Sequence, residues 1–214
     1  MPVKPKRSAT RKPPDLPSEL IPITNGPLGG RIEDALLDGF DFAADAIPEL
    51  DFRYCGIERV SFANRVVHRF RAADSRFVNC DFSNATLRGL EAARVEFIGC
   101  RLIGLKAIEC RWHDVLVEDC DARYGQLTDG RLTACEFKGS GFQDADFQGA
   151  NLEGLRTERV NFSRCNLCGA KLKDADLRGA DIEGLLVRAE DVRGAIVTPP
   201  QAMELARLLG LVIR

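Results

Sequence analysis

The chain has few of the residues from which most catalytic and metal sites are built. Its 214 residues include two histidines, His68 and His113, one tryptophan, two tyrosines and two methionines. No phosphate-binding loop or nucleophile motif occurs, and the carboxylates are spread along the chain rather than paired. Acid–base, nucleophilic and metal-dependent catalysis all need such groups close together. We therefore expect a protein that is not an enzyme, with no cofactor, no metal and no small-molecule substrate.

Long apolar runs and a strong net charge are also absent. No stretch approaches the roughly 20 apolar residues of a membrane helix, and residues 1–20 contain no apolar block before a cleavage site. The formal net charge of −2 excludes a protein that is basic overall and binds nucleic acid by charge. We expect a cytoplasmic protein without membrane contact. Its eight cysteines should then be reduced thiols.

What the sequence does contain is a repeat of five residues. From Ile32 to Val197 there are 34 positions whose numbers end in 2 or 7, and 33 hold Ala, Val, Ile, Leu, Phe or Trp; Thr157 is the exception. A period of five matches neither a helix nor an ordinary strand. It matches a four-sided coil in which each group of five forms one side and twenty residues complete a turn. Stacked coils would then pair side on side through parallel hydrogen bonds.

This geometry defines four sides and two inward positions in each group. The first side contains Phe42, the second Ile47, the third Phe52 and the fourth Ile57, and residues twenty apart stack in columns. The position two before each central residue also points inward, and 23 of its 33 occupants from Ala35 to Ala195 are small. Seven cysteines occupy this narrow position and are expected to be small buried residues: Cys55, Cys80, Cys100, Cys110, Cys120, Cys135 and Cys165.

Two features of the cysteines have a functional alternative. Cys110 and His113 have the C-x-x-H spacing of some metal sites, but the repeat directs Cys110 inward and His113 outward, and no second pair converges on them. Cys168 alone is predicted to face solvent, with no neighbour that would activate its thiol.

The clearest copies follow the pattern A-(D/N)-L-x-x, as in Ala150-Asn-Leu152 and Ala175-Asp-Leu177. This pattern resembles the pentapeptide-repeat family over about three quarters of the chain. The resemblance implies an all-β fold, a right-handed quadrilateral parallel β-helix, with a short C-terminal capping helix. We expect a flexible tail rich in proline and basic residues over 1–20, an N-terminal cap over 21–36, the β-solenoid over 37–197, and a C-terminal helix and dimerisation tail over 198–214.

The C-terminal segment has its own helix signals. Thr198 is a capping residue followed by Pro199, which suits the first helical position, and Gly210 is a natural stop after about Leu209. The run from Gln201 to Ile213 looks like the end of the pentapeptide proteins that protect DNA gyrase and topoisomerase IV from quinolones or albicidin. That resemblance implies a homodimer through Met203, Leu205, Leu208, Leu209, Leu211, Val212 and Ile213. The alternative is a cap that only seals one monomer.

The same resemblance implies a function, namely binding and protecting a type II topoisomerase by imitating DNA. Such a mimic needs carboxylates that can enter a basic groove. Formal charges over residues 30–194 sum to about −3, 0, −1 and −2 on the first to fourth sides, so the first side is the best candidate although arginines interrupt it. Its candidate residues are Asp41, Asp81, Asp121, Asp144, Asp181 and Glu183.

Two other functions stay open at this point. A protein-interaction regulator of a signalling or transcriptional partner, without a topoisomerase role, would use an apolar band formed by Ile98, Ile103 and Ile108 in successive outward positions. Nucleic-acid binding through the basic residues of the tail would be non-specific and sensitive to salt.

Overall fold

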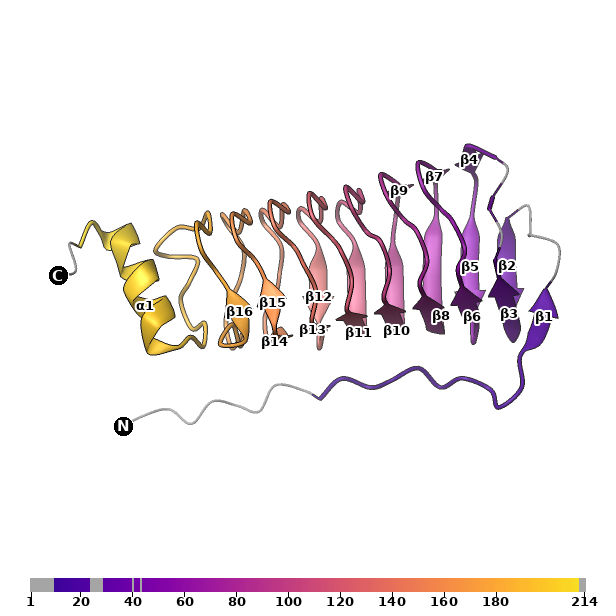
Figure 1. The fold of residues 1–214 in the computed structure, drawn as a ribbon, viewed down its shortest axis with the longest axis horizontal. Coiled ribbons are helices and arrows are strands. Elements are labelled where there is room, and N and C mark those ends of the chain that lie inside the picture. The colour runs from indigo at the N-terminus through magenta and orange to yellow at the C-terminus, as the bar shows by residue number, and fades with distance from the viewer. Residues whose placement is uncertain (1–9, 24–28, 40, 43, 212–214) are drawn as a thin grey trace.

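The computed structural model describes residues 10–23, 29–39, 41–42 and 44–211. Short parallel strands are followed by one helix at the C-terminus (Figure 1). The strands are β1 Ile21–Ile23, β2 Gly30–Glu33, β3 Ala35–Asp38, β4 Ala46–Ile47, β5 Leu50–Arg53, β6 Gly56–Glu58, β7 Val66–Val67, β8 Phe70–Val78, β9 Thr86–Leu87, β10 Glu91–Ile98, β11 Arg111–Glu118, β12 Arg131–Thr133, β13 Glu136–Lys138, β14 Arg156–Glu158, β15 Val160–Asn161 and β16 Ala180–Asp181. The helix α1 spans Pro199–Ala206, and the 3-10 turn η1 spans Arg207–Leu209.

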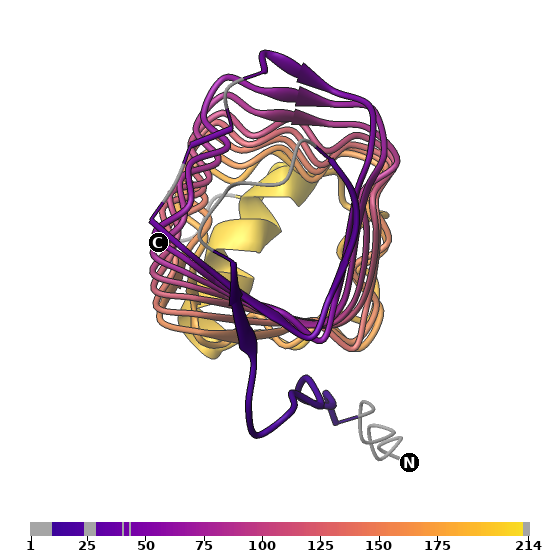
Figure 2. The same cartoon turned by 90° about the vertical axis from the view of Figure 1, so that its right-hand side faces the viewer.

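The strands belong to a β-solenoid of about eight turns with a four-sided cross-section (Figure 2). Pairing is parallel and joins residues twenty apart, as between Phe77 and Phe97 or between Val117 and Phe137. Where no strand is formed, single bridges continue the same register, for example from Asp81 to Arg101 and on to Asp121. The predicted columns and the predicted fold class are thus confirmed.

The two inward positions of each group form one continuous hydrophobic core. Phenylalanine rings stack along the columns, with centroids 4.5 Å apart for Phe62 and Phe82 and 5.0 Å apart for Phe77 and Phe97. The polar exception, Thr157, is accommodated because its hydroxyl donates a hydrogen bond to the Asp176 carbonyl at 2.8 Å. A buried hydroxyl without such an acceptor would destabilise the core.

The seven cysteines at the narrow inward position are buried, as predicted. Several thiols donate to backbone carbonyls of the preceding coil, such as Cys80 to Ile57 at 3.3 Å and Cys120 to Phe97 at 3.4 Å. Burial raises the pKa of the Cys110 thiol to about 12, which favours the protonated, unreactive form. Cys110 is buried and His113 is exposed, as their positions in the repeat predict.

The corner between the third and fourth sides differs along the solenoid. In the middle coils, β8, β10 and β11 run through this corner without interruption for eight or nine residues. The corner residues Asp74, Arg94 and Asp114 have left-handed backbone conformations, with φ of 48°, 52° and 58°. Before and after these coils the strands on the two sides are separate elements, β5 and β6 or β12 and β13.

The N-terminal segment over residues 10–20 runs back along the solenoid (Figure 1). It starts beside the coils of β10 and β11 and ends at β1, which pairs in parallel with β3 on the first coil. The described part of the tail expected over residues 1–20 therefore has a defined course. Its contacts are considered below.

The C-terminal helix begins and ends where the sequence predicts. Thr198 caps α1 in a capping box with Gln201, and Gly210, with φ of 72°, follows η1. The Gln201 side-chain amide also donates to the carbonyls of Leu177 and Ala180 at 2.8 and 2.7 Å, which attaches α1 to the last coils.

Candidate protein-binding surfaces

The acidic residues predicted on the first side form a ladder along the solenoid. Asp41, Asp81, Asp121 and Asp181 occupy the same position in different coils and belong to one chain of parallel bridges and strand pairs. Asp41, Asp181 and Glu183 are exposed, and the other three predicted acidic residues are half-buried. The structure therefore brings all six candidates to one side.

Arginines neutralise part of this ladder. Arg123 donates to both carboxylate oxygens of Asp121 at 2.9 and 2.7 Å, and Arg164 binds Asp144 in the same way at 2.7 and 2.8 Å. These hydrogen bonds lower the pKa of both carboxyl groups. The carboxylate of Asp181 instead accepts the backbone N–H of Glu183 at 3.0 Å. Asp81 likewise accepts the backbone N–H of Ser83 at 2.8 Å, so within the described part of the chain arginine pairing is confined to Asp121 and Asp144 among the six candidates.

The three isoleucines predicted to form an apolar band lie on different sides. Ile98 follows the central residue of the fourth side, Ile103 that of the first and Ile108 that of the second, because successive groups of five turn a corner. Ile108 is 51% exposed, whereas Ile98 and Ile103 are half-buried. They wrap around one coil.

The C-terminal end carries exposed apolar side chains. None of the eight residues of α1 is fully buried, and Met203, Leu208 and Leu211 are 51%, 40% and 54% exposed. Leu205 packs against the core. An apolar groove separates the helix from the last coil and is lined by Ala189, Val192, Ala195, Val197, Ala202, Leu205 and Ala206. The side chain of Leu209, and residues Val212 and Ile213, lie outside the described part of the structure.

A groove on the third side was not predicted. It has a volume of about 380 Å³ and a floor that includes four alanines in adjacent coils. These are Ala72, Ala73, Ala92 and Ala93. The recurrence of alanine at both the central position and the next one, twenty residues apart, is the sequence signal that marks it.

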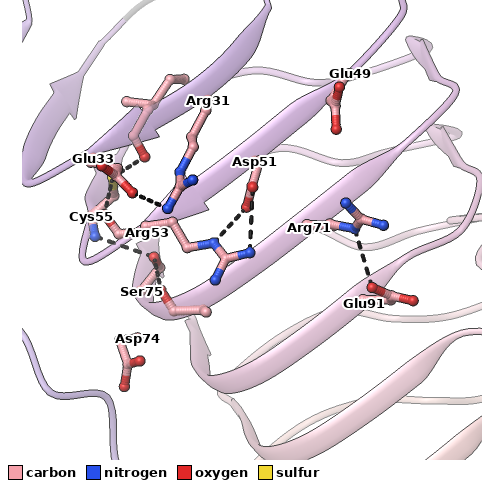
Figure 3. Close-up of polar contacts among 12 residues, drawn as sticks. Arg31, Glu33, Glu49, Asp51, Arg53, Cys55, Arg71, Asp74, Ser75 and Glu91 are labelled. Carbon is pink, nitrogen blue, oxygen red and sulfur yellow. Dashed lines mark hydrogen bonds and ion pairs between the residues drawn. The ribbon is translucent and has the colours of Figure 1, made fainter.

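Charged side chains line this groove, and Figure 3 shows three of them, Arg53, Arg71 and Glu91. Glu91 lies between Arg71 and Arg111, with ion pairs of 3.2 and 3.0 Å. Arg53 binds Asp51 at 2.8 Å, and this hydrogen bond raises the pKa of Arg53. Arg131 continues the arginine row and makes no ion pair with a described residue. The groove thus combines an apolar floor with a basic margin.

The described residues contain no group of three or more His, Cys, Asp or Glu side chains arranged to hold a metal ion. No helix among them is long and apolar enough to span a membrane.

Comparison with solved structures finds similar chains of low sequence identity. A pentapeptide repeat protein involved in heterocyst differentiation regulation, HetL from the cyanobacterium Nostoc, is 15% identical, with 78% of this chain and 86% of that chain covered and a TM-score of 0.43. Full-length QnrB1, a plasmid-mediated fluoroquinolone resistance protein, is 20% identical, with 85% and 100% covered and a TM-score of 0.36. A comparison with proteins of curated function finds no significant match.

Two family models match adjoining parts of the chain. The model of a pentapeptide repeat region matches residues 70–147, and the model of eight copies of the pentapeptide repeat matches residues 145–184. Together they cover more than half of the sequence and include the middle and last coils. With the twenty-residue register and the four-sided core, these matches show that the chain belongs to the pentapeptide-repeat family.

Proposed function

We propose that this chain is a non-enzymatic scaffold that binds a type II DNA topoisomerase, such as gyrase, and protects it from a topoisomerase poison by imitating DNA. The observation that carries the proposal is the ladder of carboxylates on the first side of a rod. Asp41, Asp81 and Asp121 recur every second coil, about 9.6 Å apart at the usual strand spacing. In the same column Ser61 and Arg101 lie between these carboxylates, so the negative charge recurs at intervals along the rod. Carboxylates repeated along a narrow rod supply the charge that a basic DNA-binding groove attracts.

The second part of the proposal is a homodimer through the C-terminal end. Met203, Leu208 and Leu211 expose apolar surface beside the groove between α1 and the last coil. A two-fold contact would bury the same residues on both subunits and double the length of the rod. Burial of this apolar surface would stabilise the dimer.

The test is supercoiling by purified bacterial gyrase, with and without a quinolone, titrated with the protein. We expect the protein to restore activity in the presence of the poison. A variant that ends at Thr198 should be monomeric by light scattering and should lose this effect. Replacing Asp41, Asp81 and Asp181 by Asn should weaken protection at least tenfold, whereas Asp129→Asn on the second side should leave it unchanged. No rescue at tens of micromolar with several poisons would contradict the proposal.

The groove on the third side favours a second candidate function, a protein-interaction regulator of a signalling or transcriptional partner. Its alanine floor and arginine margin suit an extended segment that carries apolar and acidic side chains. Ala93→Arg would fill the groove without touching the first side. If this variant loses a partner captured by the wild-type protein while gyrase is unaffected by either, the regulator is the correct function.

A further inference from the structure

The arm over residues 11–15 makes specific polar contacts with the ridge where the third and fourth sides meet. The backbone N–H of Lys12 donates to the Asp114 carboxylate at 2.9 Å, and that of Asp15 donates to the Asp74 carboxylate at 3.1 Å. The Arg11 guanidinium binds Glu96 at 3.0 Å and lies 3.8 Å from Glu136. Acidic side chains of the solenoid therefore accept hydrogen bonds from the backbone of the arm and form an ion pair with its Arg11 side chain.

The spacing of these contacts matches an extended proline-containing segment. Asp74 and Asp114 are two coils apart, which is about 9.6 Å at the usual strand spacing. Lys12 and Asp15 are three residues apart, which is about 9.3 Å in a polyproline helix. Pro13 and Pro14 lie between them, restrict φ to values that suit this conformation, and carry no N–H that would need a partner. The distance between the two carboxylates of the ridge thus matches the distance between the two backbone donors of the arm.

Burial shows that the ridge is a covered surface. Asp74, Glu96 and Asp114 occupy outward positions of the repeat, yet they are only 2%, 5% and 3% exposed. Leu116 and Ala134, also outward by register, are 5% and 7% exposed. The corner carboxylates Asp119 and Asp129, at outward positions on other corners of the solenoid, are exposed.

The arm joins the first coil through strand pairing at one end and is held at the other end by side chains of the ridge. Gly56 leaves room for Leu20, because a Cβ at residue 56 would lie 3.0 Å from the Leu20 Cδ1 atom. After a bend at Ser18 and Glu19, β1 pairs with β3. In the described part of residues 10–20, no backbone-to-backbone hydrogen bond joins the arm to the solenoid. Such a segment can separate locally while the strands stay paired.

We propose that this ridge is a recognition site for an extended basic segment of a partner protein that contains two consecutive prolines, and that residues 11–15 are its tethered occupant. Charge complementarity and the matched spacing define what the site accepts. An external segment must displace the arm, whose tether gives it an effective concentration in the millimolar range. The site is independent of the proposed topoisomerase function, because it lies on a different part of the surface from the acidic ladder.

The test starts from the full chain with a protease site inserted between Ser18 and Glu19, folded first and then cut. The probe is a fluorescent peptide of residues 10–20, and binding is measured by anisotropy. We expect saturable binding to the cut protein and at least tenfold weaker binding to the uncut protein. Replacing Asp74 and Asp114 by Asn in the cut protein should weaken binding at least tenfold. Asp129→Asn, a corner carboxylate with φ of 55° on another side, is the matched control and should have no effect.

Variants of the probe test the stated chemistry. Arg11→Glu in the peptide should abolish binding, and Pro13→Gly with Pro14→Gly should weaken it several-fold because more conformational entropy is lost. If cutting unfolds the solenoid by circular dichroism, the same titration is made on the uncut chain carrying Arg11→Glu, whose arm is weakened in place.

Three results would overturn the proposal. The first is no saturable binding to either folded protein up to millimolar peptide, and the second is equal binding to cut and uncut wild-type chains. The third is a rise in the mass of the uncut chain with concentration that Asp74→Asn abolishes, which would assign the ridge to the arm of a second copy.

Discussion

The middle coils over residues 70–118 and the last coils over residues 145–184 have the same inward pattern but different walls. In the middle coils, strands of eight or nine residues continue through the corner between the third and fourth sides. In the last coils the walls consist of strands of two or three residues and single bridges. The five-residue pattern therefore determines the core in both regions. The length of the strands in the walls differs between the two regions, and so do the outward residues and the contacts with the arm.

The largest expected effect comes from removing a core side chain in each of the two regions. Phe97→Ala removes a ring that stacks on Phe77 at 5.0 Å and on Trp112 at 5.9 Å, and should lower the free energy of unfolding by about 3–5 kcal/mol. Leu172→Ala in the last coils should cost about 2–5 kcal/mol. Guanidinium denaturation followed by Trp112 fluorescence reports the middle coils, and far-UV circular dichroism reports the whole chain. A loss below about 1 kcal/mol for Phe97→Ala would contradict the described packing.

The next effect concerns the corner that distinguishes the middle coils. Asp74 is buried and accepts hydrogen bonds from Arg94 at 2.6 and 2.5 Å and from the Asp15 backbone. Because the Arg94 side chain is 38% exposed, solvent screens part of this interaction, and Asp74→Asn should cost about 2 kcal/mol. The more exposed pair of Asp144 and Arg164, with side chains 29% and 62% exposed, is the comparison, and Asp144→Asn should leave the denaturation midpoint unchanged. Equal shifts of the denaturation midpoint for Asp74→Asn and Asp144→Asn would contradict the greater importance of the buried corner pair.

The pH dependence of stability sharpens the same comparison. The hydrogen bond from Arg94 lowers the pKa of Asp74 below its usual value of about 3.9. A lowered pKa contributes stability above the unfolded-state pKa, and this stability is lost as the pH falls through the folded-state value. Melting temperatures measured from pH 6 to pH 2 should therefore fall less steeply for Asp74→Asn below about pH 4. Parallel curves for the variant and the wild type would contradict this origin of stability.

The smallest expected effect concerns the reactivity of the cysteine thiols and does not change the fold. Burial raises the pKa of the Cys165 thiol to about 12, whereas Cys168 three residues later is half-buried at the surface. Under native conditions a thiol reagent should modify one of the eight cysteines quickly, and Cys168→Ser should abolish that reaction. Rapid modification of Cys80 or Cys100 in the middle coils would show that those coils open readily.

The fold was predictable because every coil repeats the same inward requirement. The register from Ile32 to Val197 places each column correctly, and the capping signals at Thr198 and Gly210 locate the helix. Even the polar Thr157 fits, since a neighbouring carbonyl accepts its hydroxyl.

The surfaces were less predictable because outward residues need not repeat. The pairing of Arg164 with Asp144 follows from their separation of twenty residues, but Arg123 reaches back two residues to Asp121 by choice of rotamer. The course of the arm was hidden because its composition suggests no apolar burial. Its contacts depend instead on carboxylates of the ridge that the repeat does not require. The groove on the third side has a floor of alanines at the central position and the next one, and such small side chains form neither a large apolar patch nor a charged one.

The uninterrupted register makes the residue number a measure of angular position around the rod. Removing twenty residues should shorten the solenoid by one coil and leave every remaining side chain on its original side, whereas removing five should turn everything beyond by a quarter of a circle. The arm adds a constraint on length. A twenty-residue deletion between Asp74 and Asp114 would bring its two carboxylate contacts one coil apart and put the arm out of step, while the same deletion after Lys138 would not. The contacts of the arm thus depend on the number of coils between Asp74 and Asp114.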